Sequence, residues 1–389
     1  MKKLSLLFAM LFVVGMAMSQ VIANVSETEQ DGNQNDVIVK QIGDLNDAAS
    51  HQYGNKNDAS VIQTGDENIG VADQLRGDRN AADVEQEGSL NEGYIQQGLT
   101  SDYYDGDPDA PAYDMYANDN DADVVQIGDE NFSAVGQWGN SNIGSSDQVG
   151  KNNEVYIYQG WEGTWWGGPA LYSTNSIVDI SQLGDGNSGR VWQYGGNKNE
   201  GYVNQEGDDN VVSFVQGWIY TDLNYDFYNI PVYNTHENFA SATQYGDGNH
   251  AKNIQLGSYN TFKLTQNGDN NSVGWNGATS LQESRNAYFT QDGNHNKFVG
   301  VWKSTGEDLS LWESKDAQQN HGSIVDVASY QRGDYNTIGL RQGKDDIALI
   351  QQNGISNEAL LWQQGADQNN ATMMQFGNNN SAAVVQIQQ

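Results

Sequence analysis

The chain is notable first for what it lacks: it has no cysteine, only four prolines and only 18 basic residues in 389. Without cysteine an exported chain has no disulfides, so its stability must come from its own backbone and side-chain pairing. The acidic residues number 51 and the net charge is −33. This balance argues against a protein that binds nucleic acid or an anionic membrane, because such proteins present a basic surface.

Motifs of catalysis are missing as well. The histidines are scattered, at His51, His236, His250, His295 and His321. No HExxH pair, cysteine nucleophile, phosphate-binding loop or serine elbow is present. The sequence therefore predicts a protein that is not an enzyme and takes no cofactor.

What the sequence does contain is a hexad, Gln-x-Gly-x-x-Asn, of which thirteen copies form a strict series, one in each unit of the chain. A looser copy, clearest at Gln52, Gln137 and Gln255, lies between neighbouring strict copies, and uninterrupted neighbours are 11 residues apart. The full unit is thus 22 residues, and a fixed period of this size indicates a repeat array. The strict copies comprise Gln41, Gly43, Asn46; Gln63, Gly65, Asn68; Gln86, Gly88, Asn91; Gln126, Gly128, Asn131; Gln148, Gly150, Asn153; Gln182, Gly184, Asn187; Gln205, Gly207, Asn210; Gln244, Gly246, Asn249; Gln266, Gly268, Asn271; Gln291, Gly293, Asn296; Gln331, Gly333, Asn336; Gln352, Gly354, Asn357; and Gln375, Gly377, Asn380.

Each half of the unit alternates between two faces, as a strand does. In the first unit Val37, Val39 and Gln41 share one face and Ile38 and Lys40 the other. The regular face, of small or β-branched residues and Gln, is predicted to be the interior. The Gly-x-x-Asn segment is predicted to be a turn in which Gly, and Asn after it, accept unusual backbone angles.

The places where the array is interrupted indicate how the strands are arranged. The long insertions, near residues 99–118, 161–174, 218–236 and 303–322, all follow strands of the looser type, and all four prolines lie within them. In a coil of two strands these turns share one edge. We therefore predict an all-β fold: a two-sheet β-solenoid of about 13 coils over residues 36–389, roughly 60 Å long at the usual strand spacing. Stacked Gln and Asn side chains would bond along it as ladders.

The N-terminus is predicted to direct export. Residues 1–23 have a short basic start and an apolar core too short to span a membrane, which is typical of a signal peptide, with cleavage after Ser19 or Ala23. No later segment is predicted to insert in a membrane. Residues 24–35 are polar and are interpreted as a flexible leader.

An aspartate follows the Gly in eight strict copies, so the turns would form an acidic row. Stacked carboxylates repel one another unless they are screened or bridged by cations. We interpret them as solvated turn residues, with a weak Ca²⁺-binding edge as the alternative. The eight residues are Asp44, Asp66, Asp129, Asp185, Asp208, Asp247, Asp269 and Asp334.

The pattern Gln-x-Gly-x-x-Asn-x-Ala-x-x-x-Gln, seen from Gln41 to Gln52, closely resembles the curlin repeat of curli subunits, which form bacterial extracellular amyloid. The resemblance covers nearly all of residues 36–389. It implies export through a pore in the outer membrane, partnership with a nucleator subunit, and self-polymerisation into fibres of the biofilm matrix on the cell surface. The chain has 13 units where the best-known curlins have about five, and its insertions are rich in Trp and Tyr.

Two hypotheses follow. In the first, the uncapped strands at each end of the array are polymerisation surfaces, because exposed strand edges pair with other chains. In the second, the chain is a monomeric acidic adhesin whose aromatic insertions bind glycans or surfaces. The two differ in whether the coil ends are capped.

Overall fold

The computed structural model describes residues 23–98, 116–160, 172–217, 236–255, 258–277, 285–301, 325–341, 346–364 and 369–387. The described residues form strands, turns and bends, with no helix among them. Accordingly, no described helix is long and apolar enough to cross a membrane. The predicted signal peptide and most of the four predicted insertions lie outside these ranges.

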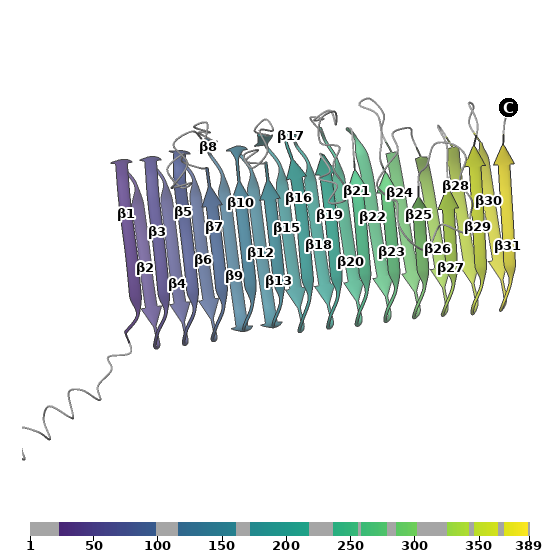
Figure 1. Ribbon diagram of the computed structural model, residues 1–389, viewed down its shortest axis with the longest axis horizontal. Coiled ribbons are helices and arrows are strands. Elements are labelled where there is room, and N and C mark those ends of the chain that lie inside the picture. Colours follow the sequence, from purple (N-terminus) through teal and green to yellow (C-terminus); the bar gives the residue numbers. More distant parts are fainter. Residues whose placement is uncertain are drawn as a thin grey trace, which may run out of the picture.

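Two long parallel sheets face each other and run the length of the molecule (Figure 1). The 14-stranded sheet consists of β1 (Val25–Asn33), β3 (Asp47–Asn55), β5 (Ile69–Asp78), β7 (Glu92–Gln97), β10 (Phe132–Gln137), β13 (Glu154–Gln159), β16 (Ser188–Tyr194), β19 (Val211–Gly217), β21 (His250–Gln255), β23 (Ser272–Gly277), β25 (Lys297–Val301), β27 (Thr337–Arg341), β29 (Glu358–Gln364) and β31 (Ser381–Ile387). The 13-stranded sheet consists of β2 (Asp36–Ile42), β4 (Asp58–Thr64), β6 (Ala81–Glu87), β9 (Asp121–Asp129), β12 (Ile143–Lys151), β15 (Ile177–Leu183), β18 (Glu200–Glu206), β20 (Phe239–Tyr245), β22 (Asn260–Asn267), β24 (Arg285–Asp292), β26 (Val325–Arg332), β28 (Asp346–Asn353) and β30 (Asn370–Phe376).

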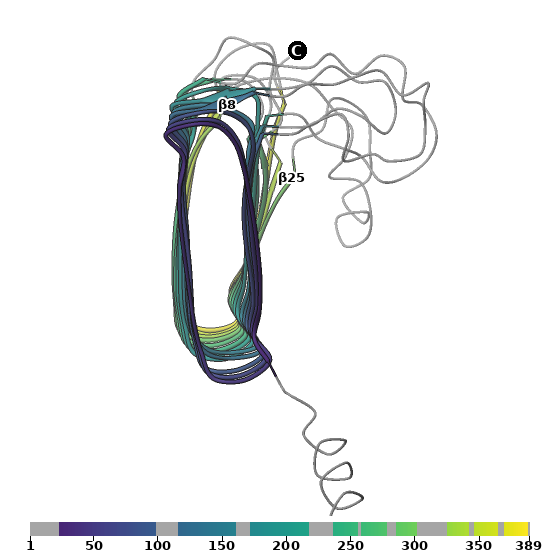
Figure 2. The same cartoon turned by 90° about the vertical axis from the view of Figure 1, so that its left-hand side faces the viewer.

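Successive strands alternate between the two sheets, so the chain winds as a solenoid. Seen along its axis, the stack has two long flat sides joined by short turns (Figure 2). The predicted two-sheet β-solenoid is confirmed, and the thirteen strict hexads end the thirteen strands of one sheet. A small third sheet, of β8 (Ala117–Asn118), β11 (Gly139–Asn140), β14 (Ser173–Thr174) and β17 (Gly196–Asn197), follows part of the opposite edge.

The interior is the regular face of the repeat, as predicted. In β4 the buried residues are Ala59, Val61 and Gln63, while Ser60 and Ile62 face outward. The apolar core runs through the stack and is filled from both sheets. Phe214, Phe262, Phe289 and Phe298 form its bulkiest part, with successive ring centroids 4.5 to 5.6 Å apart. Because each strand contributes few core residues, neighbouring coils are needed to complete the packing.

One segment differs from the prediction. Residues 24–35, interpreted above as a flexible leader, contain the strand β1, which pairs in register with β3 from Val25↔Asp47 to Asn33↔Asn55. The leader prediction is therefore wrong for this segment. The segment is polar, but it carries its own copy of the hexad from Gln30 to Asn35, 11 residues before Gln41. Pairing with an existing sheet edge outweighs its weak local strand preference.

Candidate assembly surfaces and the ladders that lead to them

The thirteen glutamines of the strict hexads form one unbroken ladder through the interior. Each side-chain Nε2 donates to the Oε1 of the Gln in the next coil, from Gln41 to Gln63 and on to Gln375, over 2.7 to 3.0 Å. The second N–H of the same amide bonds the backbone, for example Gln63 to the carbonyl of Asp47 at 2.9 Å. A buried amide would be costly alone, but here its hydrogen bonds are made within the stack.

A second glutamine ladder runs in the 14-stranded sheet. It extends without a break from Gln30 through Gln52 to Gln255, with Nε2 to Oε1 distances of 2.8 to 3.2 Å. Gly277 is the register partner of Gln255, and the ladder appears again between Gln363 and Gln386. In both ladders every Nε2 donor points toward the C-terminal end of the stack. The N-terminal end therefore begins with amide oxygens as acceptors, and the C-terminal end finishes with amide donors.

The asparagine of each hexad links three coils. Asn68 is an example: its backbone N–H donates to Oδ1 of Asn46 at 3.0 Å, and its Nδ2 donates to the carbonyl oxygen of Gly88 at 2.8 Å. These bonds recur along the strict-hexad edge and tie each turn to the coil before and the coil after it. The asparagine thus fixes the turn by bonds to neighbouring coils.

The glycine of the hexad is required by the close approach of successive coils. Gly128 has φ +121°, and a Cβ placed there would lie 2.0 Å from the carbonyl oxygen of Gly150. The left-handed residue of the turn, however, is the one before Asn, as in Leu45 with φ 59° and Glu130 with φ 58°. The expectation that Asn itself accepts these angles is thus corrected, because Asn is the residue that bonds the neighbouring coils.

The aspartates that follow Gly form a ladder of their own. Oδ1 of Asp208 accepts the backbone N–H of Asp185 at 2.9 Å, and Asp247 does the same for Asp208 at 2.9 Å. In seven of the eight aspartates proposed as a possible Ca²⁺ edge, the Oδ1 accepts a backbone N–H from the preceding coil in this way. The exception is Asp44, whose own N–H donates to Asp66. Among the described residues no group of His, Asp and Glu is arranged to hold a metal ion. These contacts give the carboxylates a structural partner in the neighbouring coil.

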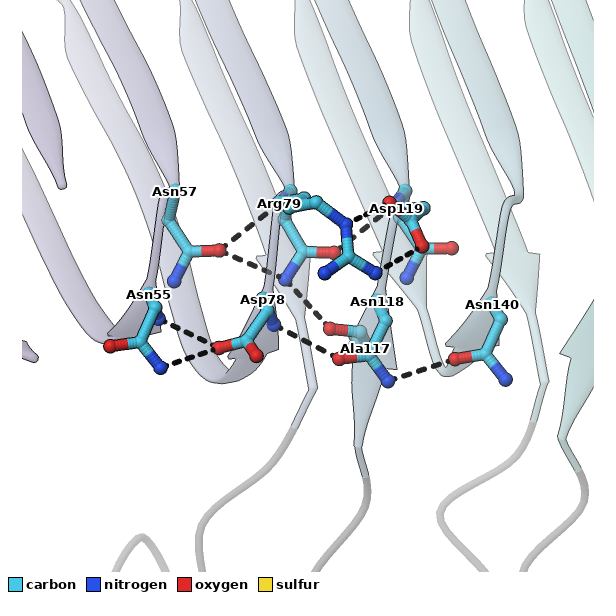
Figure 3. A network of polar contacts seen from close by, with 10 residues as sticks. Asn55, Asn57, Asp78, Arg79, Ala117, Asn118, Asp119 and Asn140 are labelled. Carbon is cyan, nitrogen blue, oxygen red and sulfur yellow. Dashed lines mark hydrogen bonds and ion pairs between the residues drawn. The ribbon is translucent and has the colours of Figure 1, made fainter. Parts of the chain in front are cut away.

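At the opposite edge, side-chain oxygens of other residues likewise accept backbone N–H groups of the neighbouring coil (Figure 3). Oδ1 of Asp78 accepts from the backbone N–H of Asn55 at 2.8 Å, and the N–H of Asp78 donates to Asn118 at 3.0 Å. Beside them the Arg79 guanidinium contacts both carboxylate oxygens of Asp119, at 2.6 and 2.7 Å. This ion pair lowers the pKa of Asp119. The ladder continues even though a long insertion lies between residues 98 and 116.

An acidic patch lies on the outer face of the 13-stranded sheet. Asp83 and Asp123 are register partners on β6 and β9, with Asp121, Asp147 and Glu85 near them. Partial burial, reinforced by the repulsion of these neighbours, raises the pKa of Asp123 to about 6. Part of the net negative charge is therefore concentrated at one place along the stack, at a cost to its stability near neutral pH.

The two ends of the stack are the surfaces on which another chain could add. The last described strands, β30 and β31, each pair with only one strand of their own sheet. Ala382 and Val384 of β31 point inward and are only partly buried. At the other end Val37 and Val39 of β2 are likewise partly buried. Both ends thus expose strand edges together with incompletely covered core residues.

A parallel solenoid held by internal amide ladders defines a class of repeat proteins. Within that class, the family model of the curlin associated repeat matches residues 29–68, 117–143 and 235–268. The chain therefore contains curlin associated repeats in these three segments, as its hexads indicated. The first matched segment includes Gln30, the hexad glutamine that the sequence reasoning had assigned to a leader. No curated protein sequence matches the chain significantly.

Proposed function

We propose that this chain is a secreted structural subunit that self-assembles end to end into curli-like amyloid fibres of the extracellular matrix. Cells would use such fibres for adhesion and aggregation. The single observation that carries the proposal is that, at both ends of the described stack, the terminal strand of each sheet pairs with a neighbour on one side only. Solenoids that remain monomeric normally cover their ends with polar capping repeats. Here a polar strand, β1, covers only the 14-stranded sheet at the N-terminal end. The other sheet leaves Val37 only partly covered there, and Val384 is only partly covered at the C-terminal end.

The ladders make the two ends complementary. The donor of Gln375 finishes the ladder of the 13-stranded sheet at one end, and the acceptor oxygen of Gln41 begins it at the other. A head-to-tail contact therefore continues the ladder, whereas a head-to-head contact brings like groups together. Such a heterologous contact does not close on itself and generates an open filament.

The family supports the remaining parts of the proposal. By analogy with curli, the chain would leave the cell through an outer-membrane secretion pore and begin its growth on a nucleator subunit. The alternative, a monomeric adhesin, relies on aromatic insertions that fall almost entirely outside the described residues. The exposed Tyr116 and Tyr172 are the described members of that set.

The test is seeded polymerisation of the purified mature chain, followed by thioflavin-T fluorescence. We expect a lag that sonicated seeds remove, and fibres with the cross-β strand spacing. A substitution that places a charge at the growing edge, Val384→Lys, should abolish growth, because the lysine would be buried at the junction. The matched control Val385→Lys alters an outward-facing neighbour, 52% exposed, and should assemble normally. A chain that remains monomeric with strand-rich circular dichroism would refute the proposal and redirect attention to the insertions.

A further inference from the structure

The described stack contains thirteen complete two-strand coils and one additional strand, β1. Each coil contributes one strand to each sheet, and from β2 to β31 both sheets contain thirteen strands. With β1 the first sheet has fourteen. The described stack therefore begins and ends with a strand of the same sheet, β1 at one end and β31 at the other.

This surplus has a consequence for two copies stacked head to tail. If β31 of one copy pairs with β1 of the next, the first sheet is continuous, but the second sheet then skips one strand between β30 and the β2 of the second copy. Such a vacancy would leave backbone N–H and C=O groups unpaired beside the core, which is costly. If β1 leaves, β31 pairs with β3 and β30 pairs with β2. Both sheets then continue without a gap.

The strand β1 is also the least embedded strand of the stack. All nine of its residues are exposed, and the residues it turns toward the interior are Ser26 and Thr28 before Gln30. At the matching positions β31 carries Ala382 and Val384 before Gln386. A strand with apolar inward residues packs better on the core than one with two hydroxyls, because it buries more apolar surface.

The contacts that hold β1 are ones that β31 of another copy can reproduce. Gln30 donates to Oε1 of Gln52 at 2.8 Å, the bond that Gln386 is oriented to make. Oδ1 of Asn24 accepts the backbone N–H of Asn46 at 2.9 Å. The residue at the matching position of the last coil is Asn380, which already ends the asparagine ladder. The strand β1 therefore mimics, in the single chain, the end of a preceding copy.

We propose that β1 is an exchangeable cap: it covers the N-terminal edge of the 14-stranded sheet in the monomer and is displaced by β31 of a second copy when the chains join. This inference rests on the proposed function, and in it the release of β1 limits the rate of fibre growth. Because every incoming chain must release its own β1, the cap slows each addition and keeps newly exported chains apart.

The test is a designed disulfide, which is straightforward because the chain has no cysteine of its own. Glu27 and Ala49 are register partners on the outer face of β1 and β3, at a spacing that a disulfide accepts. In the double variant Glu27→Cys, Ala49→Cys, oxidation should lock the cap and slow seeded growth at least tenfold, and reduction should restore it. A matched control, Ser213→Cys with Lys252→Cys, staples two register partners inside the same sheet and should grow equally well in both redox states. Deletion of residues 24–31 should shorten the lag.

The outcomes separate the two proposals. If the wild-type chain assembles and the locked variant assembles equally fast, the cap is refuted while the fibre function stands. If neither the wild-type chain nor the deletion variant assembles, the fibre function is refuted, and the cap with it. Circular dichroism of the locked variant, together with its recovery on reduction, excludes misfolding as the cause of slow growth.

Discussion

Breaking two neighbouring members of the glutamine ladder should cost far less than the sum of breaking each. Gln126 accepts from Gln86 at 2.8 Å and donates to Gln148 at 2.9 Å, and Gln148 donates onward to Gln182 at 3.0 Å. Replacing Gln126 by Leu leaves one amide donor and one amide oxygen without their ladder partners, and so does replacing Gln148. Replacing both leaves the same number, because the bond between them disappears with both of its ends.

The magnitude follows from the cost of a buried unpaired group, about 1–3 kcal/mol. Each single variant leaves two such groups, so the ladder loss is about 2–6 kcal/mol, partly offset by the more hydrophobic leucine. In the double-mutant cycle the leucine contribution cancels, and so does the loss of the backbone acceptors Glu92 and Phe132. The double variant should therefore be at least about 2 kcal/mol more stable than the sum of the singles predicts.

Equilibrium urea unfolding of the monomer at low concentration, followed by circular dichroism, measures the cycle. The control pair is Gln126→Leu with Gln205→Leu. These glutamines are separated by two others in the same ladder and share no bond. Their effects should add within about 0.5 kcal/mol. Additive effects for the neighbouring pair as well would show that the ladder bonds contribute nothing beyond packing, and would refute the reasoning.

Three further predictions concern single positions. Because the pKa of Asp123 is raised in the folded state, that state binds the proton more tightly, so the free energy of unfolding should increase as pH falls through about 6. The variant Asp123→Asn should stabilise the fold by about 1 kcal/mol at pH 7. In urea melts at several pH values, it should also remove much of the pH dependence. Gly128→Ala should lower the melting temperature strongly, whereas Gly274→Ala, where a Cβ meets nothing within 4 Å, should leave it nearly unchanged. Arg79→Gln removes an exposed ion pair with Asp119 and should lower the stability only slightly, an effect that added salt should diminish in the wild type.

Much of the architecture could be predicted because the same pattern of residues recurs in every coil. The spacing between Gln41 and Gln63 fixes the coil, and the alternation around Val61 fixes which face is inside. Repetition averages out the weak local signals that mislead single-segment reading.

The misses occurred where the signal is not repeated or is three-dimensional. The strand β1 was missed because both of its inward residues before Gln30, Ser26 and Thr28, are polar, although the hexad beginning at Gln30 was there to be found. The role of the turn aspartates was underestimated because a bond such as that from the Asp185 N–H to Asp208 joins residues 23 positions apart. Such a contact exists only once the coils are in register.

The common direction of the glutamine donors also gives the rod an electrical polarity. The backbone of a β-sheet has only a small net dipole. The glutamine amides do not cancel in this way, since each points its Nε2 toward the coil of Gln375 and its Oε1 toward that of Gln41. The asparagine amides oppose them in part, because their Oδ1 accepts from the following coil while their Nδ2 also donates forward to a glycine carbonyl. As in an α-helix, aligned dipoles sum to partial charges at the two ends, here negative at the N-terminal end and positive at the C-terminal end. Copies joined head to tail would extend this macrodipole, so that a fibre would carry a permanent moment that grows with its length and would turn to align in an electric field.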